Sequence, residues 1–361
     1  MKKKIVSALL CVAMIATMAT GCGGSKSSST SGNADSTAKQ FEINAAIAAN
    51  PPALDPHTVN ANVTGAIGIH IYEALFQMDE NYEPQPVLAE SYEMSDDGKE
   101  YTIKLRQGVK FHNGDEMKAD DVVASMNRWM ELSPKAKTLI GGSVFEKVDD
   151  YTVKLTVNEP SSDIIMVLAS PIQFAAIYPK SVVDSASDEG VKEYIGTGPY
   201  KVAEWKQDQY VKLEKNEDYQ PAEGKSSGLA GAKNAQADTI TFNIVTDTAT
   251  RIAGVQNGQY DIAEDIPADQ YKDLAADKNL TMDVRSGGTL NLFLNTTEGV
   301  MADEKVRQAA LAALNCDDIL MASYGDADLY KLNAGWCNPD DAQWGTEAGS
   351  EYYNQNDVEK A

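Results

Sequence analysis

Two stretches in the first half of the chain alternate apolar and polar residues and predict neighbouring strands. In Glu100–Arg106 (EYTIKLR) every second side chain is apolar, and Tyr151–Val157 (YTVKLTV) repeats the pattern. Side chains two apart lie on one face of a strand, so we expect both segments in one half-buried antiparallel sheet. Between them, apolar residues at helical spacing from Asp120 to Met130 predict a helix whose apolar stripe belongs to the core.

The second half of the chain alternates predicted strands with predicted helices. Tyr200–Trp205 and Tyr210–Lys215 flank four polar residues, as the strands of a β-hairpin do. Gly258 follows a helical segment in the position of a left-handed C-cap. Further strands are predicted at 239–245, at 260–263 and from Gly288 onward, and helices at 250–257 and 303–315. This alternation is typical of an α/β fold.

The first residues have the organisation of a bacterial export signal. Three lysines (2–4) precede an apolar run, Ile5–Ala19, which ends in small residues before Cys22. These small residues resemble a lipobox, in which the chain is cut before a cysteine that carries lipid, although Ala19 stands where Leu is usual. We therefore predict a signal peptide at 1–21 and lipidation of Cys22. The alternative is a short buried helix.

A polar segment rich in Ser, Thr and Gly follows the predicted cleavage site. Residues 22–40 offer almost nothing apolar to bury, so we predict a flexible tether with a root-mean-square reach of roughly 23 Å. The folded part would then lie outside the cytoplasm, held at the membrane through Cys22.

The charge of the chain argues against nucleic-acid partners. The sequence has 54 acidic and 31 basic residues, a formal net charge of -23. Phosphate contacts require clustered Lys and Arg, which this chain lacks. No apolar run reaches the ~18 residues of a membrane-spanning helix, so an integral transporter is not expected.

Catalytic signatures are missing from the sequence, which has no HExxH, GxSxG or P-loop. Phe111–Glu116 (FHNGDE) centres on Asn-Gly and predicts a turn rather than a metal site. In Gly196–Tyr200 (GTGPY) a strand follows the glycines, where a phosphate loop needs a helix N-terminus. Carboxylate pairs such as Asp96 and Asp97 arise by chance in an acidic chain. We predict no enzyme, no catalytic residue, no cofactor and no metal site.

Two cysteines, Cys316 and Cys337, remain in the predicted mature chain. Export permits a disulfide between them, but sequence spacing does not fix the Cα separation that a disulfide needs. A disulfide and two buried free thiols therefore both stay open.

Several short motifs occur in an order that resembles extracellular solute-binding protein family 5. This family comprises the oligopeptide-, dipeptide- and nickel-binding components of ABC importers. The resemblance is densest at Asp96–Val123, where Lys118 replaces the usual cap-forming Thr. The other motifs are LDPH (54–57), IYEAL (71–75), LAES (88–91), GTGPY (196–200), NG at 257–258 with DI at 261–262, and VRQA (306–309). Cys316 stands where a basic residue is common.

The resemblance implies a two-lobed periplasmic-binding-protein-like α/β fold of the class II type, with an extra subdomain in the first lobe. We expect lobe one at 41–285, its inserted subdomain at about 66–190, and the start of lobe two at 286–361. Asn356 and Glu359 form a capping box that predicts a helix start just before the last residue. We interpret the sequence as a C-terminally truncated fragment whose second lobe is incomplete; disorder of the last residues is the alternative.

By position in the family, two groups of residues are expected near the cleft between the lobes. Asn50, Pro52 and Ala53 form the first group, and Gly288, Thr289 and Asn291 form the second. The resemblance implies that a monomer captures di- or oligopeptides in this cleft and presents them to a membrane permease with its ATPase subunits. Main-chain pairing to an extended peptide gives affinity without strict side-chain selection.

Two other functions remain open. In the same fold the chain would bind a nickel chelate, a sugar or another small solute. The chain has only three histidines, however, which argues against direct metal capture by histidine ligands. A secreted hydrolase rests only on the abundance of carboxylates.

Overall fold

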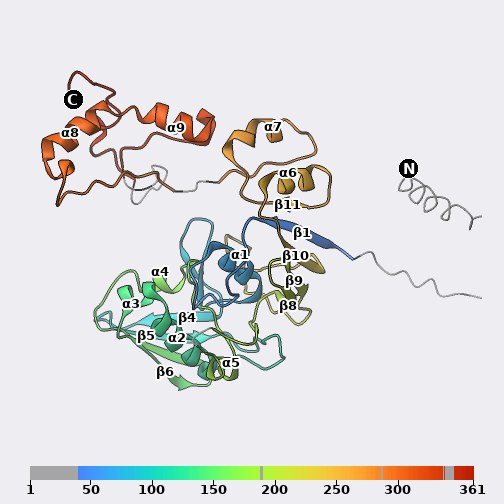
Figure 1. Cartoon of the computed structure of the whole chain (residues 1–361). Helices are drawn as coiled ribbons and strands as arrows, with labels where there is room; N and C mark the ends of the chain where they lie inside the picture. Colours follow the sequence, from blue (N-terminus) through green and yellow to red (C-terminus); the bar gives the residue numbers. More distant parts are fainter. Residues whose placement is uncertain (1–39, 188–189, 286–287, 336, 338–344) are drawn as a thin grey trace, which may run out of the picture. The chain divides into compact units, whose positions relative to one another are not determined.

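The computed structural model describes residues 40–361 except 188–189, 286–287, 336 and 338–344 (Figure 1). The predicted signal peptide at 1–21, Cys22 and the tether up to residue 39 lie outside the described residues. Within the described ranges, no helix is both long enough and apolar enough to cross a membrane.

A five-stranded mixed sheet contains the first described strand, with the strand order β11-β1-β10-β9-β8. β1 runs parallel to β10 and β11, whereas β9 is antiparallel to both β10 and β8. The predicted hairpin and the predicted strands at 239–245 and 260–263 are thereby confirmed. The strands are β1 (Glu42–Ile47), β8 (Tyr200–Lys206), β9 (Tyr210–Lys215), β10 (Thr239–Ile244) and β11 (Ile262–Ala263).

A four-stranded antiparallel sheet has the order β4-β5-β7-β6. β5 (Glu100–Leu105) and β7 (Thr152–Thr156) are direct neighbours, with Ile103 opposite Val153, as their alternation predicted. α2 (Ala119–Leu132) buries Val122, Met126 and Trp129, which confirms the predicted stripe. The edge strands are β4 (Ala89–Met94) and β6 (Val144–Asp149).

The remaining elements are short. The helices are α1 (Asn62–Ile71), α3 (Pro134–Ile140), α4 (Ile164–Leu168), α5 (Lys180–Asp184), α6 (Thr248–Gln256), α7 (Tyr271–Ala275), α8 (Glu304–Ala313) and α9 (Cys316–Tyr324). β2 (Phe76–Met78) pairs with β3 (Pro84–Pro86), and 3₁₀ turns lie at Ala268–Gln270, Val300–Ala302, Ala327–Leu329 and Ser350–Tyr352. α6 and α8 confirm the predicted helices, and Gly258 has the predicted left-handed conformation with φ of 78°.

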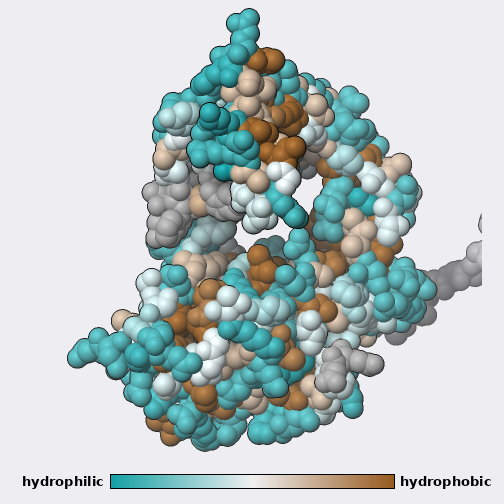
Figure 2. Space-filling view, turned by 60° about the vertical axis from the view of Figure 1, so that its left-hand side comes forward, coloured by the Kyte–Doolittle hydropathy of each residue, from teal (hydrophilic) through white to brown (hydrophobic). Residues whose placement is uncertain are grey.

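Two expectations near the end of the sequence are wrong. The predicted strand from Gly288 is not formed, because a strand needs a hydrogen-bonding partner and no described strand pairs with this segment. Leu290 and Leu292 remain 65% and 68% exposed. Apolar residues interrupt the largely hydrophilic surface at several places (Figure 2). Asn356 has φ of 49° and precedes a turn, whereas an N-cap is extended.

Cys316 and Cys337 are both free thiols.

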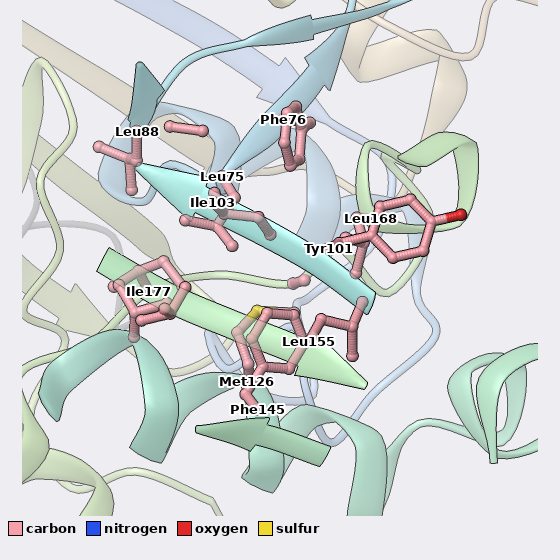
Figure 3. Packing of buried hydrophobic residues seen from close by; sticks show 14 of the residues in the cluster. Leu75, Phe76, Leu88, Tyr101, Ile103, Met126, Phe145, Leu155, Leu168 and Ile177 are labelled. Carbon is pink, nitrogen blue, oxygen red and sulfur yellow. The ribbon is translucent and has the colours of Figure 1, made fainter. Parts of the chain in front are cut away.

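Two hydrophobic clusters form the core of the described residues up to Phe242. One lies between the four-stranded sheet and its helices and draws on residues from Leu75 to Ile177 (Figure 3). The other packs α1 against the five-stranded sheet and draws on residues before Leu75 and after Ala169. A fully buried Leu, Ile or Phe contributes roughly 1.5–3 kcal/mol through burial alone, so these clusters dominate the folding free energy.

The FHNGDE and GTGPY motifs pack against each other. The His112 N–H donates to the Gly196 carbonyl at 2.9 Å, while the Gly196 N–H donates to His112 Nδ1 at 3.2 Å. His112 Nε2 in turn lies 3.1 Å from the Gly198 carbonyl. An accepting Nδ1 and a donating Nε2 define a neutral imidazole, and burial lowers the pKa of His112 to about 4. FHNGDE is thus the predicted turn, and its histidine is a packing residue.

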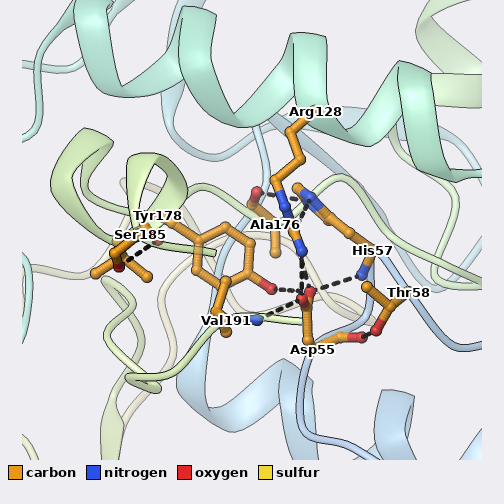
Figure 4. Close-up of polar contacts among 9 residues, drawn as sticks. Asp55, His57, Thr58, Arg128, Ala176, Tyr178, Ser185 and Val191 are labelled. Carbon is orange, nitrogen blue, oxygen red and sulfur yellow. Dashed lines mark hydrogen bonds and ion pairs between the residues drawn. The ribbon is translucent and has the colours of Figure 1, made fainter. Parts of the chain in front are cut away.

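A buried polar network fixes the connection between β1 and α1 (Figure 4). Asp55 is 1% exposed and accepts from Arg128 Nη2 at 2.7 Å and from the Tyr178 hydroxyl at 2.8 Å. The Val191 N–H and the His57 N–H each donate to the same carboxylate at 3.1 Å. Burial alone would raise the pKa of Asp55, but its hydrogen bonds and the Arg128 charge outweigh burial and lower it. The carboxylate stays ionised and joins the connection to α2 and to the chain after β7.

Gly196→Ala is expected to destabilise the protein, because a Cβ there would overlap the Ile71 carbonyl oxygen and lie 2.6 Å from Tyr72 Cδ1. Overpacking of this kind costs about 1–3 kcal/mol. Gly65→Ala in α1 is the control, since its Cβ would meet nothing closer than 3.8 Å and alanine favours a helix. Urea unfolding at pH 7 measures both variants. Equal stability of the two would contradict the packing argument.

Asp55→Asn is expected to lower the free energy of unfolding by about 3–5 kcal/mol, because it leaves the Arg128 charge buried without its partner. Asp184→Asn is the control: Asp184 pairs with Lys180 at 2.6 Å on the surface, and loss of such a pair costs about 0.5 kcal/mol. The folded pKa of Asp55 lies below its usual value of 3.8. Its contribution is therefore complete above pH 3.8 and disappears as the pH falls through the folded pKa. Similar losses in both variants at pH 7 would refute a structural role for the network.

Candidate functional site

The carboxyl ends of four strands meet at one edge of the five-stranded sheet. β1, β10 and β11 are parallel, and β8 runs the same way because β9 is antiparallel to both β10 and β8. We call the segments that leave these strands, residues 48–53, 207–209, 245–248 and 264–267, the carboxyl edge. Loops at the carboxyl ends of parallel strands commonly form ligand sites, because the chain there is free of sheet hydrogen bonds. This edge is the candidate site.

Direct hydrogen bonds hold the carboxyl edge together. The Asp208 N–H donates to Asn50 Oδ1 at 3.4 Å, and the Ala48 N–H donates to Glu264 Oε1 at 3.2 Å. Thr64 Oγ1 in the first turn of α1 donates to the Ala53 carbonyl at 2.6 Å. The segment after β1 is therefore fixed on both sides.

The first group of predicted contact residues lies on this edge. Asn50 is half-buried through its contact with the β8–β9 turn, Pro52 is exposed, and Ala53 contacts α1. In the second group, Asn291 Nδ2 donates to Thr289 Oγ1 at 2.8 Å, and Gly288 has φ of 111°. The residues of each group therefore lie near one another. Contact of either group with a ligand stays a prediction.

A pocket of about 230 Å³ adjoins the carboxyl edge at the first turn of α1. Its lining contains no charged side chain, so it suits an apolar or amide group. It is lined by Pro56, Val59, Asn60, Ala61, Asn62, Gly65, Ala66, Ile69, Pro171, Ile172, Gln173 and Leu229. Thr64, which holds Ala53, lies in the same turn of the helix. Sequence analysis missed this pocket because its walls come from three separate parts of the chain.

Four carboxyl groups lie on the carboxyl edge, those of Asp208, Asp247, Glu264 and Asp265. Hydrogen bonds from the Thr250 hydroxyl and N–H, at 2.6 and 2.8 Å, lower the pKa of Asp247, which caps α6. Partial burial raises the pKa of Glu264, although the bond from Ala48 opposes this shift. Asp265, next along the chain, is exposed. A surface of this kind favours a ligand with a positively charged group over one with free anionic groups.

The buried guanidinium of Arg251 lies behind this edge, although sequence analysis did not single it out. Arg251 is 2% exposed, and its Nη1 donates to the carbonyls of Val245 and Thr246 at 2.8 and 3.1 Å. Nε donates to the Glu264 carbonyl at 3.1 Å, and Nη2 to the Asp265 carbonyl at 2.9 Å and to Thr248 Oγ1 at 3.3 Å. The only feature of the sequence that could have indicated burial of Arg251 is its position in α6, three residues before the buried Gly254.

Metal binding has no structural support in the described part of the chain, where no three His, Cys, Asp or Glu side chains gather as ligands of one ion. His57 and His70 are both packed in the core. Burial lowers the pKa of each to about 4, so both are neutral near pH 7.

Comparison with known proteins matches residues 83–361 to the model of bacterial extracellular solute-binding proteins, family 5. The glutathione-binding protein GsiB of Salmonella typhimurium is 34% identical over 288 residues, covering 78% of this chain and 54% of that protein. GsiB of Escherichia coli O157:H7 is 33% identical over 283 residues. The chain thus spans about half the length of the curated relatives it matches.

Solved structures give the same assignment. The binding protein AgaA from A.tumefacien R10, in complex with agropinic acid, superposes with a TM-score of 0.72 at 28% identity, covering 88% of this chain and 62% of that one. The oligopeptide-binding protein AppA from Bacillus subtilis, in complex with a nonapeptide, has a TM-score of 0.63 at 26% identity, covering 89% and 63%. The predicted periplasmic-binding-protein-like α/β class is confirmed, and the chain belongs to the bacterial extracellular solute-binding proteins of family 5.

Proposed function

We propose that this chain is the substrate-binding component of an ABC importer and that it binds peptides or peptide-like solutes for delivery to a membrane permease. The observation that carries the proposal is the family match over residues 83–361. Relatives that bind glutathione and a nonapeptide support the substrate class, since each of these ligands consists of amino acids joined by amide bonds. The protein acts by binding and works as a monomer.

The chemistry of the carboxyl edge supports a peptide-like ligand. Carboxylates of Glu264 and Asp265 attract an ammonium group, and the neighbouring uncharged pocket accepts an apolar side chain. The proposed backbone contacts come from the segment after β1, where an extended ligand would pair with main-chain groups. We propose Asn50, Pro52 and Ala53 as contacts from this side.

The proposed lobe arrangement follows the sequence. Lobe one spans 41–285 with an inserted subdomain at about 66–190, and lobe two begins at 286. Separate hydrophobic clusters for the two sheets support the inserted subdomain. We propose Gly288, Thr289 and Asn291 as ligand contacts from lobe two.

Titration calorimetry of the purified full chain with reduced glutathione and with trialanine tests the function. We expect saturable one-to-one binding of at least one probe and a tenfold or greater loss of affinity in Asn50→Ala. Asn81→Ala, in an exposed turn after β2, is the matched control and should bind as the wild type does. Agropinic acid is titrated in parallel, because AgaA carries it. Binding of agropinic acid alone would replace the peptide assignment with a small-solute one, and binding of none would overturn the proposal.

We further propose that Cys22 carries a lipid anchor after cleavage of residues 1–21, with 22–40 as a tether outside the cytoplasm. Cys22→Ser is expected to abolish incorporation of labelled palmitate and to release the protein from the membrane fraction, because serine offers no thiol for the lipid. Cys316→Ser is the control and should label as the wild type does. Label retained in Cys22→Ser would refute the anchor.

A further inference from the structure

All three nitrogens of the Arg251 guanidinium donate hydrogen bonds to segments of the carboxyl edge. A guanidinium has five N–H groups, and five acceptors lie within hydrogen-bonding distance of it: four carbonyls and the Thr248 hydroxyl. None of these acceptors is a carboxylate. A buried arginine without a carboxylate among its hydrogen-bond acceptors is unusual, because a desolvated charge generally needs a direct partner. The charges of Asp247 and Glu264 act on Arg251 only through space.

The four carbonyls belong to two segments that are close in space and separate in sequence. Val245 and Thr246 leave β10, whereas Glu264 and Asp265 leave β11, and β1 lies between these two strands in the sheet. Asp265 has φ of 54°, a left-handed conformation that non-glycine residues rarely adopt without support. The bond from Arg251 to its carbonyl supplies such support. One side chain therefore sets the shape of two of the four segments that form the carboxyl edge.

We propose that Arg251 is a positioning residue for ligand binding, which holds the segments after β10 and β11 in the arrangement that receives a peptide-like ligand. The inference rests on the proposed function. Arg251 itself lies behind the edge and acts through the main chain that it holds. Lysine cannot replace it fully, because an ammonium has three N–H groups on one nitrogen and Arg251 serves five acceptors.

Arg106, which directly follows β5, provides a control outside the carboxyl edge. Its Nη1 donates to the Val87 carbonyl at 2.9 Å, and its Nη2 donates to the carbonyls of Gln220 and Pro221 at 3.0 and 2.8 Å. It thus ties main-chain segments together as Arg251 does, but none of its acceptors belongs to the carboxyl edge. Any general loss of stability from removing a guanidinium should appear in both arginines.

The test compares Arg251→Lys and Arg106→Lys with the wild type by thermal unfolding of the ligand-free full chain and by calorimetric titration of glutathione and trialanine. We expect both variants to lose melting temperature, with the larger loss in Arg251→Lys because Arg251 is more buried and makes five hydrogen bonds where Arg106 makes three. Arg251→Lys should bind the probe at least tenfold more weakly, with Arg106→Lys within twofold of the wild type. A merely structural Arg251 would move the melting temperature and leave the affinity unchanged.

The outcomes separate the inference from the function on which it rests. If the wild type binds neither probe, the proposed function fails. If the wild type binds and Arg251→Lys binds equally well, the positioning role alone is overturned. Should Arg251→Lys fail to fold, Thr248→Val removes a single acceptor of the guanidinium. Weaker binding in Thr248→Val with an unchanged melting temperature supports the role, and unchanged affinity overturns it.

Discussion

The buried ion pair between Asp55 and Arg128 is the interaction on which the arrangement of the first part of the chain depends. It lies where β1 has ended and α1 has not yet begun, and it reaches across to α2. Two charges removed from water are tolerated only when further hydrogen bonds satisfy them. Tyr178, Val191 and His57 supply those bonds. The connection that carries Asn50, Pro52 and Ala53 is thereby fixed to both hydrophobic clusters.

Arg128 and Arg251 have different structural roles in this fold. Arg128 neutralises a carboxylate and joins distant elements, whereas Arg251 meets only main-chain and hydroxyl oxygens and shapes the edge of one sheet. The planar guanidinium suits both tasks, because its N–H groups point in fixed directions and stay charged at any physiological pH. Rigid support behind a polar edge reduces the ordering that a ligand must impose when it binds.

Alternation and helical spacing predicted the regular elements well where those elements are amphipathic. β5, β7 and α2 are half-buried, and their periods of two and 3.6 residues are visible in the sequence. The strand expected from Gly288 shows the limit of this argument, since Leu290 and Leu292 alternate correctly and yet lie in a segment without sheet partners. Periodicity describes which face a strand would bury, but strand formation requires a second backbone.

The sequence by itself determined the α/β class, the main strands and helices, the turn in FHNGDE and the family. These follow from local patterns and from motif order along the chain. Only the tertiary structure decided that His112 packs on Gly196, that Asp55 meets Arg128 across 73 residues, and that Arg251 joins the ends of β10 and β11. Each of these contacts depends on the path of the backbone between distant segments. Long-range pairing of polar groups leaves no periodic signal, because its geometry exists only after the apolar faces have packed.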